Sequence, residues 1–277
     1  MLKKTTVKTI QKMKESGEKI AVLTAYDYST AKYLDEAGVD IILVGDSLAN
    51  VALGYSSTQS IGITEMLIFT GAVARGSNRA FIIGDMPFMS YNVSVEDGMK
   101  NCGDMIKAGA NAVKIEGCNE YLLSLIKRLT DSGIPVLGHL GFTPQSINTL
   151  GGHTVQGKDI DAVNNILEQA KLLENAGVFA IVLEMVSEEG SKYITENLKV
   201  PTIGIGSGKY CSGQVLVSDD MLGKFSDYQP KFVRKYADIK GTVLKAAEAY
   251  CADVKNGNYP ASDEAFHTEA MTEIISQ

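Results

Sequence analysis

Short runs of apolar residues, rich in Ile, Val and Leu, recur along the chain, and most are followed by a polar or glycine-containing turn and a longer amphipathic segment. Most of these runs do not alternate between apolar and polar residues, which is typical of strands buried on both faces of a parallel sheet. We therefore predict eight strands, the last of them the weakest: Ile20–Ala25, Ile41–Val44, Ala80–Ile83, Ala112–Ile115, Pro135–Leu137, Phe179–Leu183, Thr202–Ile205 and Gln214–Val217.

The amphipathic segments between these runs predict helices, and each of the clearest ends at or near a glycine, a common signal of a helix C-terminus. Repeated strand–helix units with short turns indicate a parallel α/β sheet, and eight of them favour a closed barrel over an open doubly wound sheet. The clearest helical segments are Ser29–Ala37, Glu96–Ala108, Glu120–Thr130 and Asp161–Ala176.

The two ends of the chain extend this pattern. Apolar residues at positions 7, 10 and 13 share one helical face, which favours a short helix packed on the domain, with a targeting helix as the alternative. The segment Lys231–Lys255 is predicted to be helical, and the polar tail from Asn256 to wrap a surface or a neighbouring subunit. We expect one (β/α)8 TIM-barrel domain over residues 1–277, with an N-terminal helix and a C-terminal helical extension.

Composition and charge argue against a nucleic-acid partner, a membrane helix and secretion. The net charge is −7 and no basic stripe is present, which argues against a nucleic-acid partner. No apolar run approaches the roughly 20 residues that a membrane helix needs, and the N-terminus lacks the apolar segment of a secretory signal. The four cysteines form no CxxC pair, so we expect reduced thiols and a cytoplasmic protein.

Polar residues that could take part in catalysis or ligand binding stand at the ends of the predicted strands. In a barrel, the carboxyl ends of all strands meet at one face, where catalytic groups gather. Four acids, a lysine and a histidine are therefore expected to point toward one mouth. These residues, with a serine beside the first acid, are Asp46, Ser47, Asp85, Lys114, Glu116, His139 and Glu184.

Carboxylates that lie close together repel one another, and a divalent cation removes that conflict. Hard carboxylate oxygens, without a two-histidine motif, favour Mg²⁺ over zinc. Asp46, Asp85 and Glu116 are the natural ligand set, and a 2-oxo acid can chelate the same ion. Lys114 lies two residues before Glu116 and so faces the same side of its strand, where it would bind a substrate carboxylate or form a structural ion pair.

Glu184 ends an apolar strand on the far side of the predicted ring. Burial there would raise its pKa toward the range useful to a general base. The predicted chemistry is removal of a proton beside a carbonyl, with the metal stabilising the developing enolate. For His139 two interpretations stay open, a substrate contact and a buried histidine with satisfied hydrogen bonds.

Two glycine-rich segments also lie near the predicted mouth. Gly204–Gly208 (GIGSG) is either a phosphate site, as at this position of many barrels, or a tight turn. Leu150–Lys158 is expected to form a mobile loop or lid.

Several of these segments together resemble the ketopantoate hydroxymethyltransferase family (3-methyl-2-oxobutanoate hydroxymethyltransferase), and the resemblance covers roughly residues 3–260. The stretches that carry it are VGDSL at Val44–Leu48, GDMPFMSY at Gly84–Tyr91, AGANAVKIEG at Ala108–Gly117, VLGHLGFTPQSIN at Val136–Asn148, GGHTVQG at Gly151–Gly157, Pro201–Gly208, Gln214–Val217 and PKFVRKYAD at Pro230–Asp238.

The resemblance implies a (β/α)8 barrel, often assembled as a homodecamer, that acts in pantothenate and coenzyme A synthesis. The family transfers a hydroxymethyl group from 5,10-methylenetetrahydrofolate to 3-methyl-2-oxobutanoate and so makes 2-dehydropantoate. By motif it assigns Mg²⁺ to Asp46, Asp85 and Glu116, the oxo acid to Asp46, Ser47, Asp85 and Lys114, and proton acceptance to Glu184.

The sequence departs from the family pattern at several positions outside this metal and base set. Ser56 stands where the family has Asp, Phe69 where His is common, and Gln59-Ser60 where Leu-Pro is usual. Ser212 replaces an Asp and Asp219 a His. We expect these changes to alter the surroundings of the mouth more than the type of reaction.

Two other functions compete with this interpretation. One is a related Mg²⁺-dependent 2-oxo acid lyase or mutase of the phosphoenolpyruvate mutase and isocitrate lyase kind, for which Cys118 is the candidate nucleophile. The other is a non-catalytic phosphate-binding or scaffold barrel, which leaves the converging acids unexplained.

Overall fold

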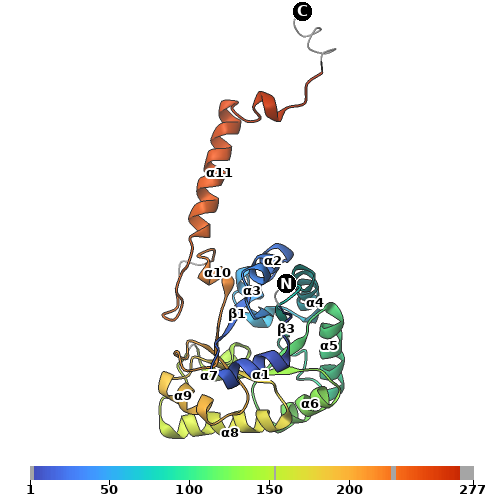
Figure 1. The fold of residues 1–277 in the computed structure, drawn as a ribbon, viewed down its shortest axis with the longest axis vertical. Helices are drawn as coiled ribbons and strands as arrows, with labels where there is room; N and C mark the ends of the chain where they lie inside the picture. The colour runs from blue at the N-terminus through green and yellow to red at the C-terminus, as the bar shows by residue number, and fades with distance from the viewer. Residues whose placement is uncertain (1–2, 153, 226–228, 269–277) are drawn as a thin grey trace, which may run out of the picture.

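Eight parallel strands form a closed barrel in the computed structural model, which describes residues 3–152, 154–225 and 229–268 (Figure 1). Each strand pairs with the next along the chain, and β8 closes the ring by pairing with β1, where Val22 lies opposite Val215. The strands are β1 (Ile20–Thr24), β2 (Ile41–Val44), β3 (Phe81–Asp85), β4 (Ala112–Glu116), β5 (Val136–Gly141), β6 (Ala180–Glu184), β7 (Thr202–Ile205) and β8 (Gly213–Leu216). The predicted closed barrel and its eight strands are confirmed.

Helices cover the outside of the barrel (Figure 1). Most of the longer helices are capped at the N-terminus by a side chain that accepts a backbone hydrogen bond, as Asp27 does from Thr30 and Asp159 from Ala162. Gly109 and Gly177 end two helices with positive φ, which glycine adopts without steric cost. The longer helices are α1 (Val7–Ser16), α2 (Tyr28–Glu36), α4 (Ile63–Gly76), α5 (Val95–Ala108), α6 (Glu120–Asp131), α8 (Ile160–Ala176), α9 (Glu188–Glu196) and α11 (Ile239–Asn256).

Short helical turns lie mainly in the loops after the strands. They are α3 (Leu48–Val51), η1 (Thr58–Ser60), η2 (Pro144–Ser146), α7 (Ile147–Leu150), α10 (Ser218–Met221) and η3 (Ser262–Glu264). No helix separates β7 from β8 within the described residues, so the strand–helix repeat is incomplete there. The loops after β2 and β5 carry η1 and η2, which pack against each other.

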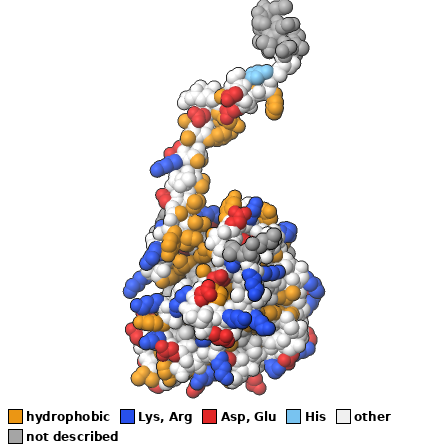
Figure 2. Space-filling view, viewed as in Figure 1, with side chains coloured by type: hydrophobic (Ala, Val, Ile, Leu, Met, Phe, Trp, Pro, Cys, Tyr) orange, Lys and Arg blue, Asp and Glu red, His pale blue; other side chains and the backbone are white. Residues whose placement is uncertain are grey.

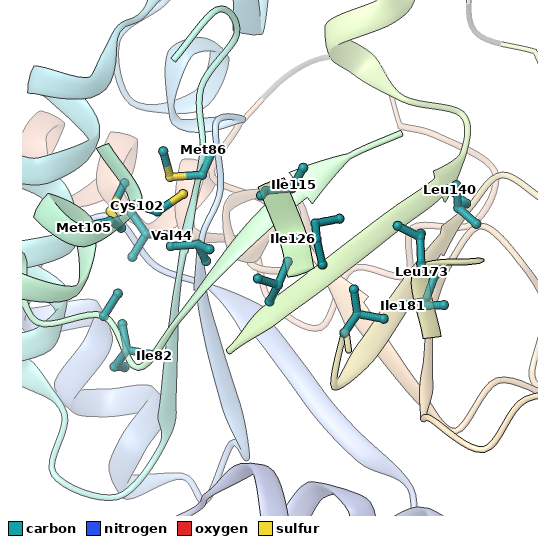
Figure 3. Close-up of a cluster of buried hydrophobic side chains, with 14 of the residues drawn as sticks. Val44, Ile82, Met86, Cys102, Met105, Ile115, Ile126, Leu140, Leu173 and Ile181 are labelled. Atoms are coloured by element: carbon teal, nitrogen blue, oxygen red, sulfur yellow. The ribbon is translucent and has the colours of Figure 1, made fainter. Parts of the chain in front are cut away.

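Two apolar clusters hold the fold together. One fills the barrel interior with residues such as Ile41, Ile83 and Val182, and Ile10 and Met13 of α1 belong to the same cluster. This confirms that the N-terminal segment is a helix packed on the domain. The larger cluster lies between strands and helices and is partly drawn in Figure 3, where Val44, Ile82, Met105, Ile115, Ile126, Leu173 and Ile181 are among the labelled side chains.

The C-terminal helix begins later than the sequence predicts. It starts at Ile239, because Asp238 caps it by accepting a hydrogen bond from the Gly241 backbone at 2.9 Å. The expectation of helix from Lys231 is therefore wrong for its first eight residues. This helix, α11, projects from the barrel and none of its residues is buried (Figure 1).

The described part of the polar tail, residues 257–268, is exposed and continues beyond α11. These described residues of the tail do not wrap this chain's own barrel, and the alternative that the tail wraps a neighbouring subunit stays a prediction. The remainder of the tail lies outside the described residues, as does His153 within the predicted lid. No helix in the described part of the chain is long and apolar enough to cross a membrane.

Candidate active site

A cavity of about 410 Å³ opens among the residues that end the barrel strands. Because all eight strands are parallel, their carboxyl ends meet at this face. The cavity brings together every site residue that the sequence predicts: Asp46, Ser47, Asp85, Lys114, Glu116, His139 and Glu184.

Lys114 lies at the centre of the charged groups. Its Nζ atom is 2.9 Å from Asp85 Oδ2 and 3.4 Å from Glu116 Oε1, and the side chain is 5% exposed. Burial alone would lower its pKa, but Asp85, Glu116 and Asp46 outweigh burial and raise the pKa above its usual value. Lys114 is therefore a buried cation that lines the cavity together with Glu116, as their two-residue spacing on β4 predicts.

Asp46 and Asp85 form a close carboxylate pair beside this cation. The Asp46 backbone N–H donates to Asp85 Oδ2 at 3.1 Å, whereas the buried Asp85 Oδ1 has no hydrogen-bond partner among the described residues. Burial and the Asp85 charge raise the pKa of Asp46, and burial raises that of Asp85 despite the opposing effect of Lys114. An unpartnered buried oxygen next to a second carboxylate is suited to a cation.

Glu116 differs because both of its oxygens already have partners. Oε1 lies 3.4 Å from Lys114 Nζ and 3.2 Å from His139 Nδ1, and Oε2 accepts a hydrogen bond from the Gln145 backbone at 3.1 Å. Burial would raise its pKa, but Lys114 and His139 lower it to about 2. Glu116 is thus an ionised carboxylate that holds two cationic side chains.

His139 bridges Glu116 and Glu184. Its Nε2 atom lies 3.3 Å from Glu184 Oε2, and the ring is 2% exposed. Burial and the nearby Lys114 lower the pKa of His139, but Glu116 and Glu184 outweigh them and raise it to about 9. The histidine is therefore charged at neutral pH, and its Nε2 lies at ion-pair distance from Glu184 without forming an aligned hydrogen bond.

The backbone holds Glu184 in place at the end of β6. Phe142 N–H donates to the Glu184 carbonyl at 2.8 Å, and Met185 N–H donates to the Ile205 carbonyl at 2.8 Å. Met185 has a φ of 50°, a left-handed conformation that costs a residue with a side chain about 1–3 kcal/mol. The Glu184 side chain stays 17% exposed, so it reaches the cavity without complete burial.

The donors present fit Mg²⁺ at Asp46 and Asp85. Both supply hard oxygens, and Asp85 Oδ1 lacks a partner. Within the described residues, no three acidic, histidine or cysteine side chains already converge as a ligand set. The predicted third ligand, Glu116, has both oxygens engaged, so the geometry favours Asp46 and Asp85 as the direct ligands.

Residues 4–262 match the family model for ketopantoate hydroxymethyltransferase. The chain belongs to this family.

Individual relatives agree with the family model over nearly the whole chain. The 3-methyl-2-oxobutanoate hydroxymethyltransferase of Thermoanaerobacter sp. (strain X514) is 50% identical over 270 residues, covering 97% of this chain and 98% of its own. That of Syntrophus aciditrophicus (strain SB) is 51% identical over 265 residues, covering 95% and 97%.

Solved structures with the same fold come from more distant proteins. Phosphonopyruvate hydrolase in complex with oxalate and Mg²⁺ has a TM-score of 0.61 at 14% identity, covering 98% of this chain and 94% of its own. The lyase for 2,3-dimethylmalate, a member of the phosphoenolpyruvate mutase/isocitrate lyase superfamily, has a TM-score of 0.60 at 14% identity, covering 99% and 95%. At this identity the likeness establishes the barrel fold alone.

Cys118 is the candidate nucleophile of the competing lyase or mutase interpretation, and it does not line the cavity. Its thiol contacts the Gln169 carbonyl on α8 at 3.6 Å. Burial raises the pKa of this thiol, whereas a reactive cysteine needs a lowered one. All four cysteines lie within the described residues and are free.

The positions that depart from the family pattern are spread more widely than expected. Ser56 lines the cavity, but Phe69 packs against the hydrophobic core from α4. Ser212 lies just before β8, at the opposite end of the barrel, where it exchanges hydrogen bonds with Thr202. Asp219 is buried and pairs with Lys224 at 2.8 Å. Of these four, Ser56 is the position that directly shapes the mouth.

Sequence reasoning missed Gln145, an uncharged residue in the loop after β5. Its side chain donates to Asp46 Oδ2 at 3.1 Å, and it is 5% exposed. Its position four residues after β5, in the GFTPQ segment, could have identified it. A search for acids and bases does not select an amide side chain. The glycine-rich segment Gly204–Gly208 turns after β7 with positive φ at Gly206 and Gly208, and Ser207 donates to the Leu183 carbonyl at 2.7 Å. The turn is present, and the phosphate site stays a prediction.

Proposed function

We propose that this chain transfers a hydroxymethyl group from 5,10-methylenetetrahydrofolate to 3-methyl-2-oxobutanoate, giving 2-dehydropantoate for pantothenate and coenzyme A synthesis. The names of the close relatives support the oxo acid and the transferred group. The observation that carries the proposal is a single cavity in which Glu184 faces the cluster of Lys114, Asp46 and Asp85.

Binding of the oxo acid follows from the charges in the cavity. Lys114 attracts the substrate carboxylate, and the Ser47 hydroxyl, held 2.8 Å from Tyr26 Oη, offers a polar contact. Asp46 and Asp85 would hold Mg²⁺, which stabilises negative charge that develops on the carbonyl oxygen of a 2-oxo acid. The distant phosphonopyruvate hydrolase, solved with oxalate and Mg²⁺, supports this choice because oxalate also presents adjacent oxygens.

Glu184 is the proposed general base. Water adds to the folate-borne one-carbon unit and breaks both of its C–N bonds, so tetrahydrofolate leaves with the two protons of the water and formaldehyde remains. The Glu184 carboxylate takes the proton from C3 of the oxo acid, the electron pair left behind forms the new bond to the formaldehyde carbon, and the formaldehyde oxygen takes up that proton as the hydroxyl of the product. His139 lies 3.3 Å from Glu184 Oε2 and lines the same cavity, so we place it as a positioning residue for Glu184 and a contact for the substrate.

Deuterium exchange tests the proposal before any folate is added. The protein is incubated in heavy water with Mg²⁺ and 3-methyl-2-oxobutanoate, and deuterium at C3 is followed by NMR. We expect exchange in the wild type and a loss of about 100-fold or more in Glu184→Gln. Adding methylenetetrahydrofolate should then give 2-dehydropantoate.

A matched variant, Glu189→Gln, changes an exposed glutamate on the following helix and should exchange like the wild type. The proposal fails if the wild-type protein shows no exchange, or if Glu184→Gln exchanges at the wild-type rate.

We also propose that several copies assemble, as the family's homodecamers imply, and that the assembly works in the cytoplasm. The exposed apolar side chains of α11 support assembly: Val243 and Leu244 are 59% and 53% exposed, and Tyr250 is 57% exposed. Figure 2 shows apolar side chains gathered along this arm. Sedimentation velocity would test it, and a monomer at micromolar concentration would contradict it.

A further inference from the structure

Two loops at the mouth of the cavity are joined by one glutamine side chain. The η1 turn follows β2 and the η2 turn follows β5. Gln59, in η1, donates from Nε2 to the backbone carbonyl of Gln145, in η2, at 2.7 Å. Asn148 Nδ2 donates back to Gln59 Oε1 at 3.3 Å. The side chain of Gln59 therefore closes the gap between segments 86 residues apart.

Gln145 connects this closure to the charged cluster below. Its side-chain amide donates to Asp46 Oδ2 at 3.1 Å and to the Met86 carbonyl at 2.9 Å. Its Oε1 accepts from Tyr91 Oη at 2.8 Å, and its backbone N–H donates to Glu116 Oε2 at 3.1 Å. Every polar group of Gln145, a buried residue, is thus engaged.

The orientation of the Gln145 amide follows from its partners. The Met86 carbonyl can only accept a hydrogen bond. A flipped amide would face it with its own oxygen and would also lose the N–H that is donated to Asp46 Oδ2. Gln145 therefore holds Asp46 in one direction, toward the cavity.

We propose that Gln59 and Gln145 act as a clasp that holds the η1 and η2 loops together and fixes Asp46 for substrate binding. Both are positioning residues, and their catalytic readout rests on the proposed transferase function. The clasp has two parts. Gln59 sets the distance between the loops, and Gln145 transmits that placement to the carboxylate.

Hydrogen–deuterium exchange measured by mass spectrometry tests the clasp without any substrate. In the full-length Gln59→Leu variant, amides in segment 144–150 should exchange about 2- to 12-fold faster, the effect of losing one neutral hydrogen bond. Gln11→Leu is the matched control. It removes a hydrogen bond from Gln11 Nε2 to the Lys199 carbonyl at 3.2 Å, at the other end of the barrel, and should leave this segment unchanged.

Steady-state kinetics then test whether the position of the two loops affects the Asp46 carboxylate through Gln145. Gln145→Met removes the amide at similar volume and should lower kcat/KM by about 10- to 100-fold, as for other residues that orient metal ligands. Gln59→Leu should lower kcat/KM by about 2- to 12-fold. Because the effect of Gln59 passes through the Gln145 side chain, the double variant should match Gln145→Met alone.

The outcomes separate this inference from the proposed function. Unchanged exchange of segment 144–150 in Gln59→Leu would overturn the clasp, whatever the activity of the wild type. Multiplying effects in the double variant would overturn the link through Gln145. A wild-type protein that catalyses no transfer would overturn the proposed function, and the exchange comparison would still decide the clasp. If Gln145→Met does not fold, Gln59→Leu, a change at a half-buried position, still tests the proposal by hydrogen–deuterium exchange.

Discussion

Replacing Lys114 with methionine removes a buried positive charge while keeping the length of the side chain. The Nζ atom lies 2.9 Å from Asp85 Oδ2, so at an effective dielectric constant of about 20 their attraction is about 6 kcal/mol. Methionine avoids the cost of burying the ammonium group, which offsets part of that loss. We therefore expect Lys114→Met to lower the free energy of unfolding by about 3–5 kcal/mol near neutral pH.

The pH dependence of this loss follows from the neighbouring acids. The pKa values of Asp46 and Asp85 are raised in the folded protein, so their protonated forms favour the fold at low pH, and that stability disappears as pH rises through the folded pKa. Without Lys114 these pKa values should rise further. The deficit of the variant should therefore be larger at a neutral pH than at an acidic pH, where these carboxyl groups are protonated in both proteins.

Urea unfolding followed by circular dichroism, at one protein concentration and without metal, measures both effects. Lys107→Met is the matched control, because Lys107 also lies 2.9 Å from a carboxylate, Asp104, but is 79% exposed. It should cost no more than about 0.5 kcal/mol. A loss below about 1 kcal/mol in Lys114→Met, or one equal at both pH values, would refute the reasoning.

Three further changes test how the fold supports the site. Gly141→Ala should lower the free energy of unfolding by about 2–5 kcal/mol and abolish deuterium exchange at C3. Gly141 has a φ of +92°, and an added Cβ would lie 2.3 Å from the Glu184 carbonyl oxygen. Gly151→Ala is the control, because Gly151 has a φ of +71° but open space around it, and this variant should keep the exchange. Asp35→Asn should lower the free energy of unfolding by about 1–2 kcal/mol at neutral pH and by less below about pH 4. The reason is that the backbone N–H groups of residues 78–80 outweigh burial and lower the pKa of Asp35. Equal losses at both pH values in urea titrations would contradict this. Leu173→Ala, at a fully buried position, should cost about 2–5 kcal/mol by urea unfolding, and a loss under about 1 kcal/mol would show that its surroundings collapse into the gap.

The sequence alone was sufficient for the barrel and for most of the charged site. Strands and helices follow local hydrophobic periodicity, which can be recognised in a window of roughly 11–18 residues. Parallel strands bring their carboxyl ends to one face, so residues as distant as Asp46 and Glu184 could be placed together without coordinates. The pairing of Lys114 with Glu116 followed from the two-residue repeat of a strand.

Tertiary structure decided which of these groups touch and which residues support them. Gln145 meets Asp46 from 99 positions away, and only closure of the barrel and the paths of two loops set that distance. The same holds for Cys118, which faces α8 rather than the cavity, and for Ser212, which lies at the opposite end of the barrel. Local patterns determine the type of element, whereas contacts between loops depend on their three-dimensional course, for which periodicity carries no information.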